Sequence, residues 1–262
     1  MRIIVTGAAS GIGRAAAKML TTDALERGQK PRLVLADIAA DPLADAAREV
    51  QALGGEVETI AADLSVPETS AKIVALAEKA FGGLEALISN AGIIQFAEMQ
   101  DMTLEQWDLA FNINTRPTWL LAKAAYPMLK ASKGSIVATT SLAAHEPTPR
   151  LGAYAPSKAA LLMVIRQLAN AWGPDGIRSN TVSPGTTATS IGRTPGTVID
   201  RTGDVGKNPL GVITTAEDQA AAIAFLVSPA ARFINGTDIG VDGGARTQLM
   251  TASGMAAAPA KT

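Results

Sequence analysis

Short runs of apolar, β-branched residues alternate with longer helical stretches along almost the whole chain, and this alternation limits the possible folds more than any other feature. The runs lack the polar alternation of a sheet with one face in water, so each is predicted to be a strand covered on both faces. Seven strands are predicted: Arg2–Thr6, Leu33–Asp37, Val57–Ala61, Ala86–Ser89, Ser135–Thr140, Arg178–Val182 and Thr237–Val241. Strands joined through helices by short connections form a parallel, doubly wound α/β sheet.

The predicted helices lie between these strands, and several have clear start signals. They span Gly11–Thr21, Pro42–Leu53, Pro67–Phe81, Leu104–Lys130, Gly152–Trp172 and Thr215–Ser228. Pro42 and Pro67 stand at first helical positions, where a missing N–H does no harm, and Thr103 with Gln106 resembles a capping box. No break in composition divides the chain, so residues 1–250 are predicted to form one domain.

Three segments depart from the strand–helix pattern. Residues 22–31 are longer than the connection to the second strand requires, so a loop is predicted to bulge there. Residues 186–211 combine Gly, Pro, Thr and charges without a period, and we predict that they form a loop over the substrate, because long irregular segments in compact domains are usually functional. The Ala/Gly/Pro-rich tail, residues 251–262, is predicted to be disordered.

Charge and composition exclude several classes of function. The net charge is −1 and the pI about 5.9, so neither nucleic acid nor an anionic membrane is an expected partner. The chain has no cysteine and one histidine, His145, which excludes a Cys/His zinc site, and no acidic cluster suggests another metal. No signal-peptide segment and no apolar run of the ~18 residues of a spanning helix is apparent, so we predict a cytoplasmic protein.

Three glycines, Gly7, Gly11 and Gly13, directly follow the first predicted strand, and a helix begins at once. A turn this tight directs backbone amides and a helix N-terminus toward one point, which suits a bound diphosphate. The alternative is a tight strand-to-helix turn without a ligand. A P-loop is excluded because no Gly-Lys-Ser/Thr follows. The spacing favours a dinucleotide site in a Rossmann-type sheet.

Asp37 ends the second predicted strand and bears on the choice of cofactor. A carboxylate at that point accepts hydrogen bonds from the ribose hydroxyls of an adenosine and repels a 2′-phosphate. No Arg or Lys occupies residues 8–10 or 38–39, where a cation would neutralise that phosphate. The sequence therefore favours NAD over NADP. The alternative is that Asp37 only caps the turn.

Tyr154 and Lys158 open a predicted helix and, four residues apart, share one of its faces. An alcohol must lose a proton as hydride leaves, but an unperturbed tyrosine, with a pKa of about 10, is a poor base at neutral pH. A nearby cation favours the phenolate and lowers that pKa. Taken alone, such a pair is far more often part of a solvated helix face. Its meaning depends on the other motifs.

With these motifs in the same order, the chain resembles the short-chain dehydrogenase/reductase family over about residues 1–245. The resemblance implies four catalytic residues: Asn114, Ser141, Tyr154 and Lys158. In the family the serine hydrogen-bonds to the substrate oxygen and the tyrosine is the acid–base group. The lysine lowers the tyrosine pKa and binds the nicotinamide ribose, and the helical asparagine holds a water of the proton relay.

The resemblance also implies a set of cofactor-binding residues and an assembly. Besides Tyr154 and Lys158, these residues are Gly7, Ser10, Gly11, Ile12, Gly13, Asp37, Asp63, Leu64, Asn90, Ala91, Gly92, Pro184, Gly185, Thr187 and Thr189. The implied assembly is a homotetramer. Residues 104–130 and 152–172 would pack across one interface, and the last strand and the tail across another.

Some positions depart from the family pattern or leave an alternative open. Ser89 stands where the family often has a second asparagine, and it retains a hydrogen-bonding group. Pro117 replaces a common glycine and is expected to kink its helix, since proline lacks the N–H that the helix requires. We hypothesise that this kink leaves a carbonyl free for water. Thr139 or Thr140 could replace the serine, and Asn112 the asparagine, if the alignment shifts.

The sequence therefore predicts an oxidoreductase that transfers a hydride between NAD(H) and a secondary alcohol or ketone, with oxidation the expected direction. The first alternative is an NADPH-dependent carbonyl reductase, and the second is a non-catalytic, cofactor-sensing protein. The substrate pocket is expected between residues 186–211 and 145–151. A sugar, a steroid, a dihydrodiol and a small secondary alcohol all remain open, and His145 is expected to be exposed.

Overall fold

The apolar runs form the buried middle of a single parallel sheet. The computed structural model describes residues 1–189, 191 and 208–247. Its strands are β1 (Arg2–Thr6), β2 (Arg32–Asp37), β3 (Glu56–Ala61), β4 (Ala86–Ser89), β5 (Ser135–Thr139), β6 (Arg178–Pro184) and β7 (Asp238–Val241). They lie in the order β3-β2-β1-β4-β5-β6-β7, and every neighbouring pair is parallel. The predicted Rossmann-type sheet of seven strands is confirmed.

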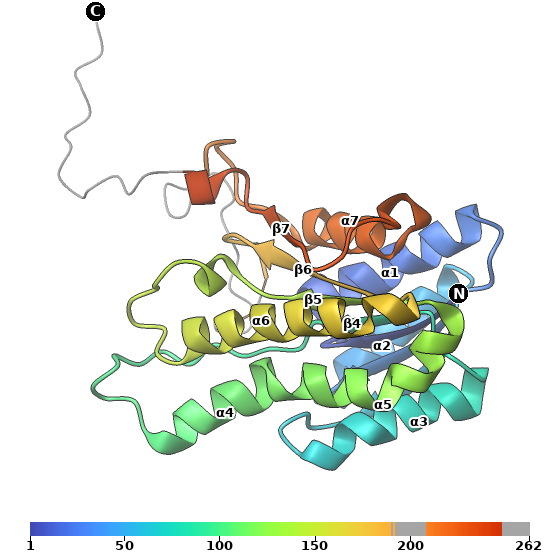
Figure 1. Ribbon diagram of the computed structural model, residues 1–262, viewed down its shortest axis with the longest axis horizontal. Coiled ribbons are helices and arrows are strands. Elements are labelled where there is room, and N and C mark those ends of the chain that lie inside the picture. Colours follow the sequence, from blue (N-terminus) through green and yellow to red (C-terminus); the bar gives the residue numbers. More distant parts are fainter. Residues whose placement is uncertain (190, 192–207, 248–262) are drawn as a thin grey trace, which may run out of the picture.

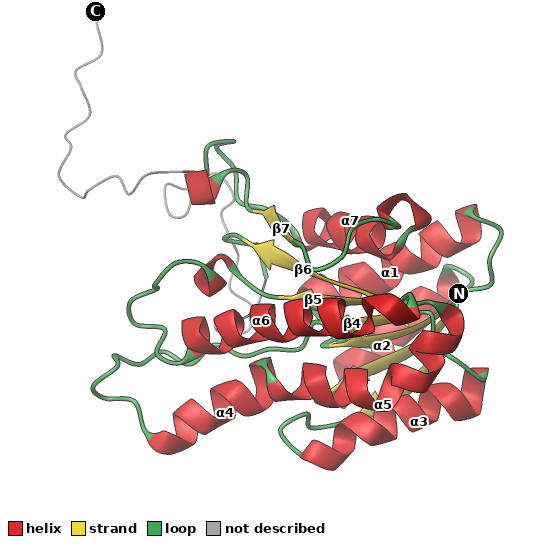
Figure 2. Cartoon of the chain, viewed as in Figure 1, coloured by secondary structure: helices red, strands yellow, loops and turns green. Residues whose placement is uncertain are grey.

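Helices cover both faces of this sheet (Figure 1). On one face, α1 (Gly11–Glu26), α2 (Ala40–Ala52) and α7 (Ala216–Val227) share an apolar core with the strands. On the other face, α3 (Pro67–Phe81), α5 (Arg116–Ser132) and α6 (Tyr154–Trp172) share a second core. Figure 2 shows the two helical layers with the strands between them, and α4 (Leu104–Asn114) packs against α5 and α6. Within the described ranges, none of the helices has the length and apolarity needed to cross a membrane.

The winding of the chain determines where a ligand can bind. From β1 the chain moves outward to β2 and β3, and it then returns to β4 on the other side of β1. The connections that leave β1 and β4 therefore run to opposite faces, and they open a crevice at the carboxyl ends of these strands. The glycine loop, the Asn90 segment and Ser141 each follow the carboxyl end of a strand, and Asp37 ends one, so the topology directs them to this edge.

Several helix boundaries differ from the predictions, most of them by one or two residues. The first helix continues to Glu26, so residues 22–26 are helical and do not form the expected bulging loop. Thr21 is tolerated because its hydroxyl donates to the carbonyl of Ala17, and Ala24 continues the buried face. Helix α2 begins at Ala40, so Pro42 lies two positions deeper in the first turn, where an N–H would have no partner in any case.

The predicted helix over residues 104–130 is two helices. Helix α4 ends at Asn114, Thr115 leaves the helical conformation with φ −122° and ψ −59°, and α5 begins at Arg116. Pro117 is in the first turn of α5, so the kink expected from this proline is confirmed as a full break. The predicted capping box of Thr103 and Gln106 at the start of α4 is confirmed as well.

Strand β3 lies at the edge of the sheet and is largely exposed. The prediction that every strand is covered on both faces is therefore wrong for β3. Of the predicted substrate loop, only residues 186–189, 191 and 208–211 are described. The rest of that loop and the tail at 251–262 lie outside the described residues.

Candidate active site

A cavity of about 640 Å³ opens at the carboxyl ends of the strands, on the edge that the topology indicated. Its wall contains every predicted cofactor-binding residue except Gly13, and three of the four predicted catalytic residues, Ser141, Tyr154 and Lys158. Asn114 does not line it. The motifs, far apart in the sequence, therefore surround one space.

The glycine loop is built from close backbone contacts. Gly7 has a φ of +65°, which favours glycine, and a Cβ there would lie 2.9 Å from the Cα of Ala91. A Cβ on Gly13 would overlap the carbonyl group of Gly7, so Gly13 allows α1 to approach β1 and does not face the cavity. Gly7, Gly11 and the N-terminus of α1 border the cavity, which leaves room for a diphosphate against the helix N-terminus.

Asp37 faces the cavity and also has structural partners. One carboxylate oxygen accepts from the backbone N–H of Ala9 at 3.0 Å, and the other accepts from that of Ala39 at 3.0 Å. Asp37 therefore does cap the turn, as in the alternative interpretation, through these two hydrogen bonds. A carboxylate has about four acceptor sites, so it can still accept from a ligand hydroxyl.

The Asn90-Ala91-Gly92 segment follows β4 and is fixed to the neighbouring strands. The Asn90 amide group donates to the carbonyl of Thr6 at 3.3 Å and accepts from the Thr139 hydroxyl at 2.9 Å. The Thr6 hydroxyl accepts from the backbone N–H groups of Asn90 and Ala91. Ser89, the departure from the family pattern, is paired with the Thr118 hydroxyl at 2.7 Å, so it does keep a hydrogen bond. Hydrogen bonds therefore connect this wall of the cavity to β1, β5 and α5.

Tyr154 begins α6 and is almost completely buried. Burial raises the pKa of its phenol, and a hydrogen bond with the Ser141 side chain opposes that rise. The Ser141 hydroxyl also accepts from the backbone N–H of Ala143 at 3.1 Å, which fixes its position at the start of η1 (Leu142–Ala144). Ser141 and Tyr154 are therefore brought together as predicted, with Ser141 and neither Thr139 nor Thr140 next to the phenol.

Lys158 lies one turn further along α6 and is buried. Its ammonium donates to the carbonyl of Thr139 at 2.8 Å and lies 5.8 Å from the centroid of the Tyr154 ring. Desolvation lowers the pKa of Lys158 to about 8. The predicted lowering of the Tyr154 pKa by Lys158 is not observed, because burial dominates and raises that pKa instead.

Asn114 lies beneath the cavity and is fully buried. Its side-chain oxygen accepts from the backbone N–H of Ile93 at 2.8 Å, and its amide nitrogen donates to the Ile93 carbonyl and to the Ser157 hydroxyl. Both amide hydrogens are therefore used within the protein. The side chain holds the segment after Gly92 against α6, which connects Asn114 to the cavity wall indirectly.

The substrate side of the cavity contains residues that the motifs did not identify. The described part of this side is mostly apolar and includes Ile93, Ile94, Leu142, Ala143, Thr148, Leu151 and Ile191. Their adjacency to the motifs was the only signal for them. His145 does not line the cavity, and the expectation of an exposed histidine is confirmed, although its ring also contacts Asp238 at 2.7 Å. Arg150 points to solvent, and Arg193, Arg201, Asp204 and Lys207 lie outside the described residues.

The residues of the cavity fit a nicotinamide dinucleotide. The glycine loop provides space and backbone donors for a diphosphate, Asp37 provides an acceptor for ribose, and Lys158 provides a buried donor near Tyr154. Among residues 1–189, 191 and 208–247, no group of His, Asp and Glu side chains is arranged to hold a metal ion.

Comparison with known proteins agrees with this geometry. Residues 7–246 match the family model described as enoyl-(acyl carrier protein) reductase. The L-rhamnose 1-dehydrogenase (NAD(P)(+)) of Azotobacter vinelandii is 34% identical over 249 residues, which cover 92% of this chain and 95% of that protein. The 2-(S)-hydroxypropyl-CoM dehydrogenase 3 of Xanthobacter autotrophicus is 36% identical over 256 residues, with the same coverage of 92% and 95%.

A solved structure shows the same fold. A short-chain dehydrogenase from Burkholderia cenocepacia J2315, in complex with NADP, superimposes with a TM-score of 0.83 at 35% identity, over 94% of this chain and 97% of the other. The chain belongs to the short-chain dehydrogenase/reductase family.

Proposed function

We propose that this protein is an NAD(H)-dependent oxidoreductase that interconverts a secondary alcohol and a ketone. The observation that supports this most strongly is that Ser141, Tyr154 and the buried Lys158 line the same cavity as the glycine loop and Asp37. The named relatives at 34% and 36% identity are both dehydrogenases, and the name of the second contains a hydroxypropyl substrate, which supports this reaction class.

NAD, when bound, supplies the acceptor for the hydride. Ser141 holds the alcohol oxygen next to the Tyr154 phenol, and Tyr154 removes the hydroxyl proton. Lys158, with its pKa lowered to about 8, exchanges a proton readily near neutral pH and passes it away from Tyr154. Asn114 contributes by holding the Ile93 segment that forms the wall beside Lys158. In the direction of ketone reduction Tyr154 donates the proton.

The raised pKa of Tyr154 has a consequence for pH dependence. The phenol is protonated at neutral pH, which suits reduction, whereas oxidation requires the phenolate. We expect the rate of oxidation to increase as the pH rises above 7, and the rate of reduction not to increase. A bound cofactor that carries positive charge favours the phenolate further, by the general effect of a nearby cation.

The substitution Tyr154→Phe tests the proposal. Loss of the acid–base group should reduce turnover by at least about 100-fold, while NADH binding, followed by fluorescence, stays close to that of the wild type. Tyr126→Phe is a matched control, because Tyr126 is the chain's other tyrosine and hydrogen-bonds to Asp175 instead of facing the cavity. Full activity of the Tyr154→Phe variant would refute the assignment and would favour the non-catalytic alternative.

NAD is the proposed cofactor because Asp37 faces the cavity without an Arg or Lys among the residues beside it. The alternative, an NADPH-dependent carbonyl reductase, has its own support. The related structure from B. cenocepacia contains NADP, and the rhamnose dehydrogenase is named for both cofactors. Comparison of kcat/KM for the two cofactors decides between them.

The substrate is proposed to be a small-molecule alcohol or ketone. A panel of sugars, dihydrodiols, steroids and simple secondary alcohols, followed by NADH absorbance, identifies its class. The apolar residues along the described part of the substrate side, such as Ile94, Leu142 and Leu151, favour substrates with an apolar body.

A homotetramer in the cytoplasm is proposed. Trp107, Trp119 and Met163 are exposed on α4, α5 and α6, so large apolar side chains occur on the first of the two expected interfaces. Phe225 on α7 and Phe233, in the segment before the last strand, are exposed as well. Light scattering of the purified protein tests the assembly, and cell fractionation tests the location. A monomer in solution would exclude the tetramer without affecting the proposed reaction.

A further inference from the structure

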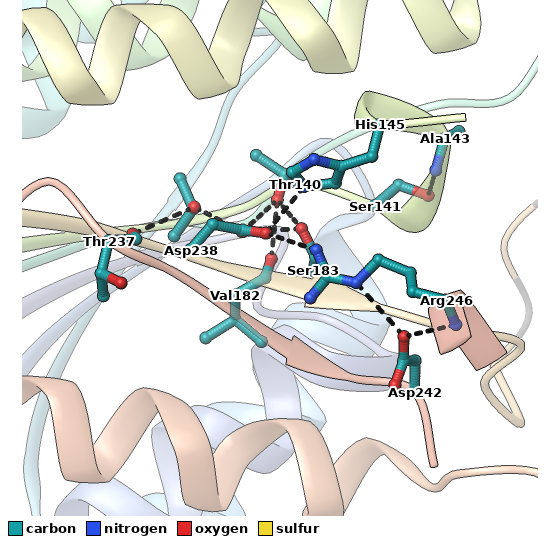
Figure 3. Close-up of polar contacts among 11 residues, drawn as sticks. Thr140, Ser141, Ala143, His145, Val182, Ser183, Thr237, Asp238, Asp242 and Arg246 are labelled. Carbon is teal, nitrogen blue, oxygen red and sulfur yellow. Dashed lines mark hydrogen bonds and ion pairs between the residues drawn. The ribbon is translucent and has the colours of Figure 1, made fainter. Parts of the chain in front are cut away.

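Asp238, the first residue of β7, is a buried carboxylate that lies outside the cavity and has no part in the proposed reaction. Its side chain is only 4% exposed. Figure 3 shows polar side chains converging on it from four parts of the chain. A buried charge without partners is strongly unfavourable, so the role of Asp238 is inferred from the groups that bind its carboxylate.

One oxygen of the carboxylate, Oδ1, is bound by hydroxyl groups. Thr181 donates to it at 2.6 Å and Ser183 at 2.7 Å, both from β6. Thr140, which follows β5, lies 3.4 Å from the same oxygen and shares a 2.7 Å hydrogen bond with the Ser183 hydroxyl. The neighbouring strand β6 therefore holds Asp238 in place, and Thr140 is attached to the same cluster.

The other oxygen, Oδ2, contacts two nitrogen groups. His145 Nε2 lies 2.7 Å away, and Arg246 Nη1 donates to it at 3.0 Å. Arg246 also reaches Asp242, at 3.3 Å. Its guanidinium lies across β7 at Gly240, where any Cβ would overlap it, so the glycine leaves the space that the arginine uses. These contacts hold the pKa of Asp238 below its usual value despite burial.

Two of the partners of Asp238 flank Ser141 in the sequence. Thr140 immediately precedes Ser141, and His145 immediately follows η1, the short helix that Ser141 caps. Both ends of residues 140–145 are thus attached to the cluster around one carboxylate, while the Ser141 hydroxyl points away from that cluster and accepts from the Ala143 N–H (Figure 3). The same side chain interacts with the Tyr154 phenol.

We propose that Asp238 is a positioning residue for Ser141: through Thr140 and His145 it fixes both ends of the segment that presents the serine hydroxyl to Tyr154. The inference rests on the proposed function for the roles of Ser141 and Tyr154. It adds a hydrogen-bonded connection between β7 and the reacting groups, and it gives the chain's single histidine a role outside the substrate pocket.

The chain offers a direct probe of this connection. It has two tyrosines, so in a Tyr126→Phe background Tyr154 is the sole tyrosine, and one ¹³Cζ-tyrosine NMR resonance reports its hydrogen bonding. Ser141→Ala removes the hydrogen bond and sets the size of the full effect on this resonance. We expect Asp238→Ala and His145→Ala to move the resonance in the same direction by a substantial part of that effect. No substrate is needed for the measurement.

Three controls separate positioning from a loss of stability. His145→Gln retains an N–H that reaches the place of Nε2, and it should restore the wild-type resonance. Glu85→Gln weakens an ion pair with Arg2 at the amino ends of the central strands β1 and β4, away from the cavity, and should leave the resonance unchanged. Adding His145→Ala to Ser141→Ala should have no further effect, because both act through one hydrogen bond.

Activity provides a second measurement once the panel has identified an alcohol that is oxidised. Asp238→Ala and His145→Ala should lower kcat by about tenfold with an unchanged dissociation constant for NADH. If Ser141→Ala moves the resonance but His145→Ala and a folded Asp238→Ala do not, the inference is wrong while the proposed function stands. If Asp238→Ala does not fold, His145→Ala decides alone, since His145 is partly exposed. If Ser141→Ala itself has no effect, the proposed active-site geometry fails.

Discussion

Helix α6 and strand β7 each place a buried charge beside the same active-site segment, and the two charges have opposite surroundings. Lys158 on α6 donates to a single carbonyl, that of Thr139, and within residues 1–189, 191 and 208–247 no carboxylate pairs with it. Asp238 on β7 is held by hydroxyls, an imidazole and a guanidinium. The pKa of Lys158 is therefore lowered to about 8, toward the neutral form, whereas that of Asp238 is lowered toward permanent ionisation.

The comparison separates a charge that takes part in chemistry from one that supports it. A group whose charged and neutral forms are close in free energy near pH 7 can transfer protons. A carboxylate surrounded by donors cannot, because its protonation would leave those donors without an acceptor. Burial alone does not distinguish the two groups. They differ in the number of their hydrogen-bonding partners and in whether those partners carry an opposite charge.

Lys158→Met should have the largest effect on this comparison. Activity should fall by at least about 100-fold, because proton transfer and cofactor contact are both lost. Without cofactor the variant should be more stable than the wild type at pH 7, by up to about 3 kcal/mol, since the pKa falls from 10.5 to about 8 on folding.

The sign of that stability difference depends on pH. The folded pKa of Lys158 lies below the unfolded value, so the wild type regains stability as the pH rises from about 8 to about 10.5, and the advantage of Lys158→Met shrinks over that interval. Urea unfolding at pH 7 and pH 10 measures both quantities. A variant that is less stable than the wild type at pH 7 would contradict the view of Lys158 as an uncompensated charge.

Asp37→Ser tests whether a partly free carboxylate behaves differently from Asp238. Serine can replace one of the two backbone contacts but offers no charge to the ribose hydroxyls, so the preference for NAD over NADP in kcat/KM should fall by about 10- to 100-fold. Asp238→Asn is the matched control and should leave that ratio unchanged. If both variants changed the ratio equally, the distinction between the two carboxylates would be lost.

Asp238→Asn should lower the free energy of unfolding at pH 7 by about 1–2 kcal/mol, because hydrogen bonds to a charged acceptor are weakened. The folded pKa of Asp238 is lowered, so its contribution is present above the unfolded pKa of about 3.8 and is lost as the pH falls through the folded value. The wild type should therefore lose more stability than the variant below about pH 4. Equal acid sensitivity in chemical denaturation would count against this.

Gly240→Ala should have the smallest effect, within about 1 kcal/mol in stability, because the atom that a Cβ would displace is the flexible end of Arg246. Gly13→Ala is the instructive contrast. There the obstructing atom is the backbone carbonyl of Gly7, which cannot move away, so a larger loss of thermal stability is expected. Thermal melts of the two variants provide the comparison.

The sequence was sufficient to predict the sheet and the glycine loop, because these depend on local signals: apolar runs and glycine spacing. The rest of the cavity wall and the pairing of Ser141 with Tyr154 were predicted from the resemblance to a known family. The sequence was insufficient for the end of α1, where Thr21 resembled a stop but bonds to the preceding turn. The partner of His145 was also beyond reach, since Asp238 lies 93 residues away in sequence. Contacts between distant polar side chains leave no periodic pattern to detect.

The break at Thr115 has a consequence for the local dynamics of the active site. Helix α4 buries only Ala110 and Asn114, whereas α5 buries six residues of its own, so the two helices should not open together. Amide hydrogen exchange should be faster through α4 than through α5. Asn114 holds the backbone of Ile93, so each opening of α4 would release the cavity wall beside Lys158. The Ile93 amide should therefore exchange at the same rate as the amides of α4.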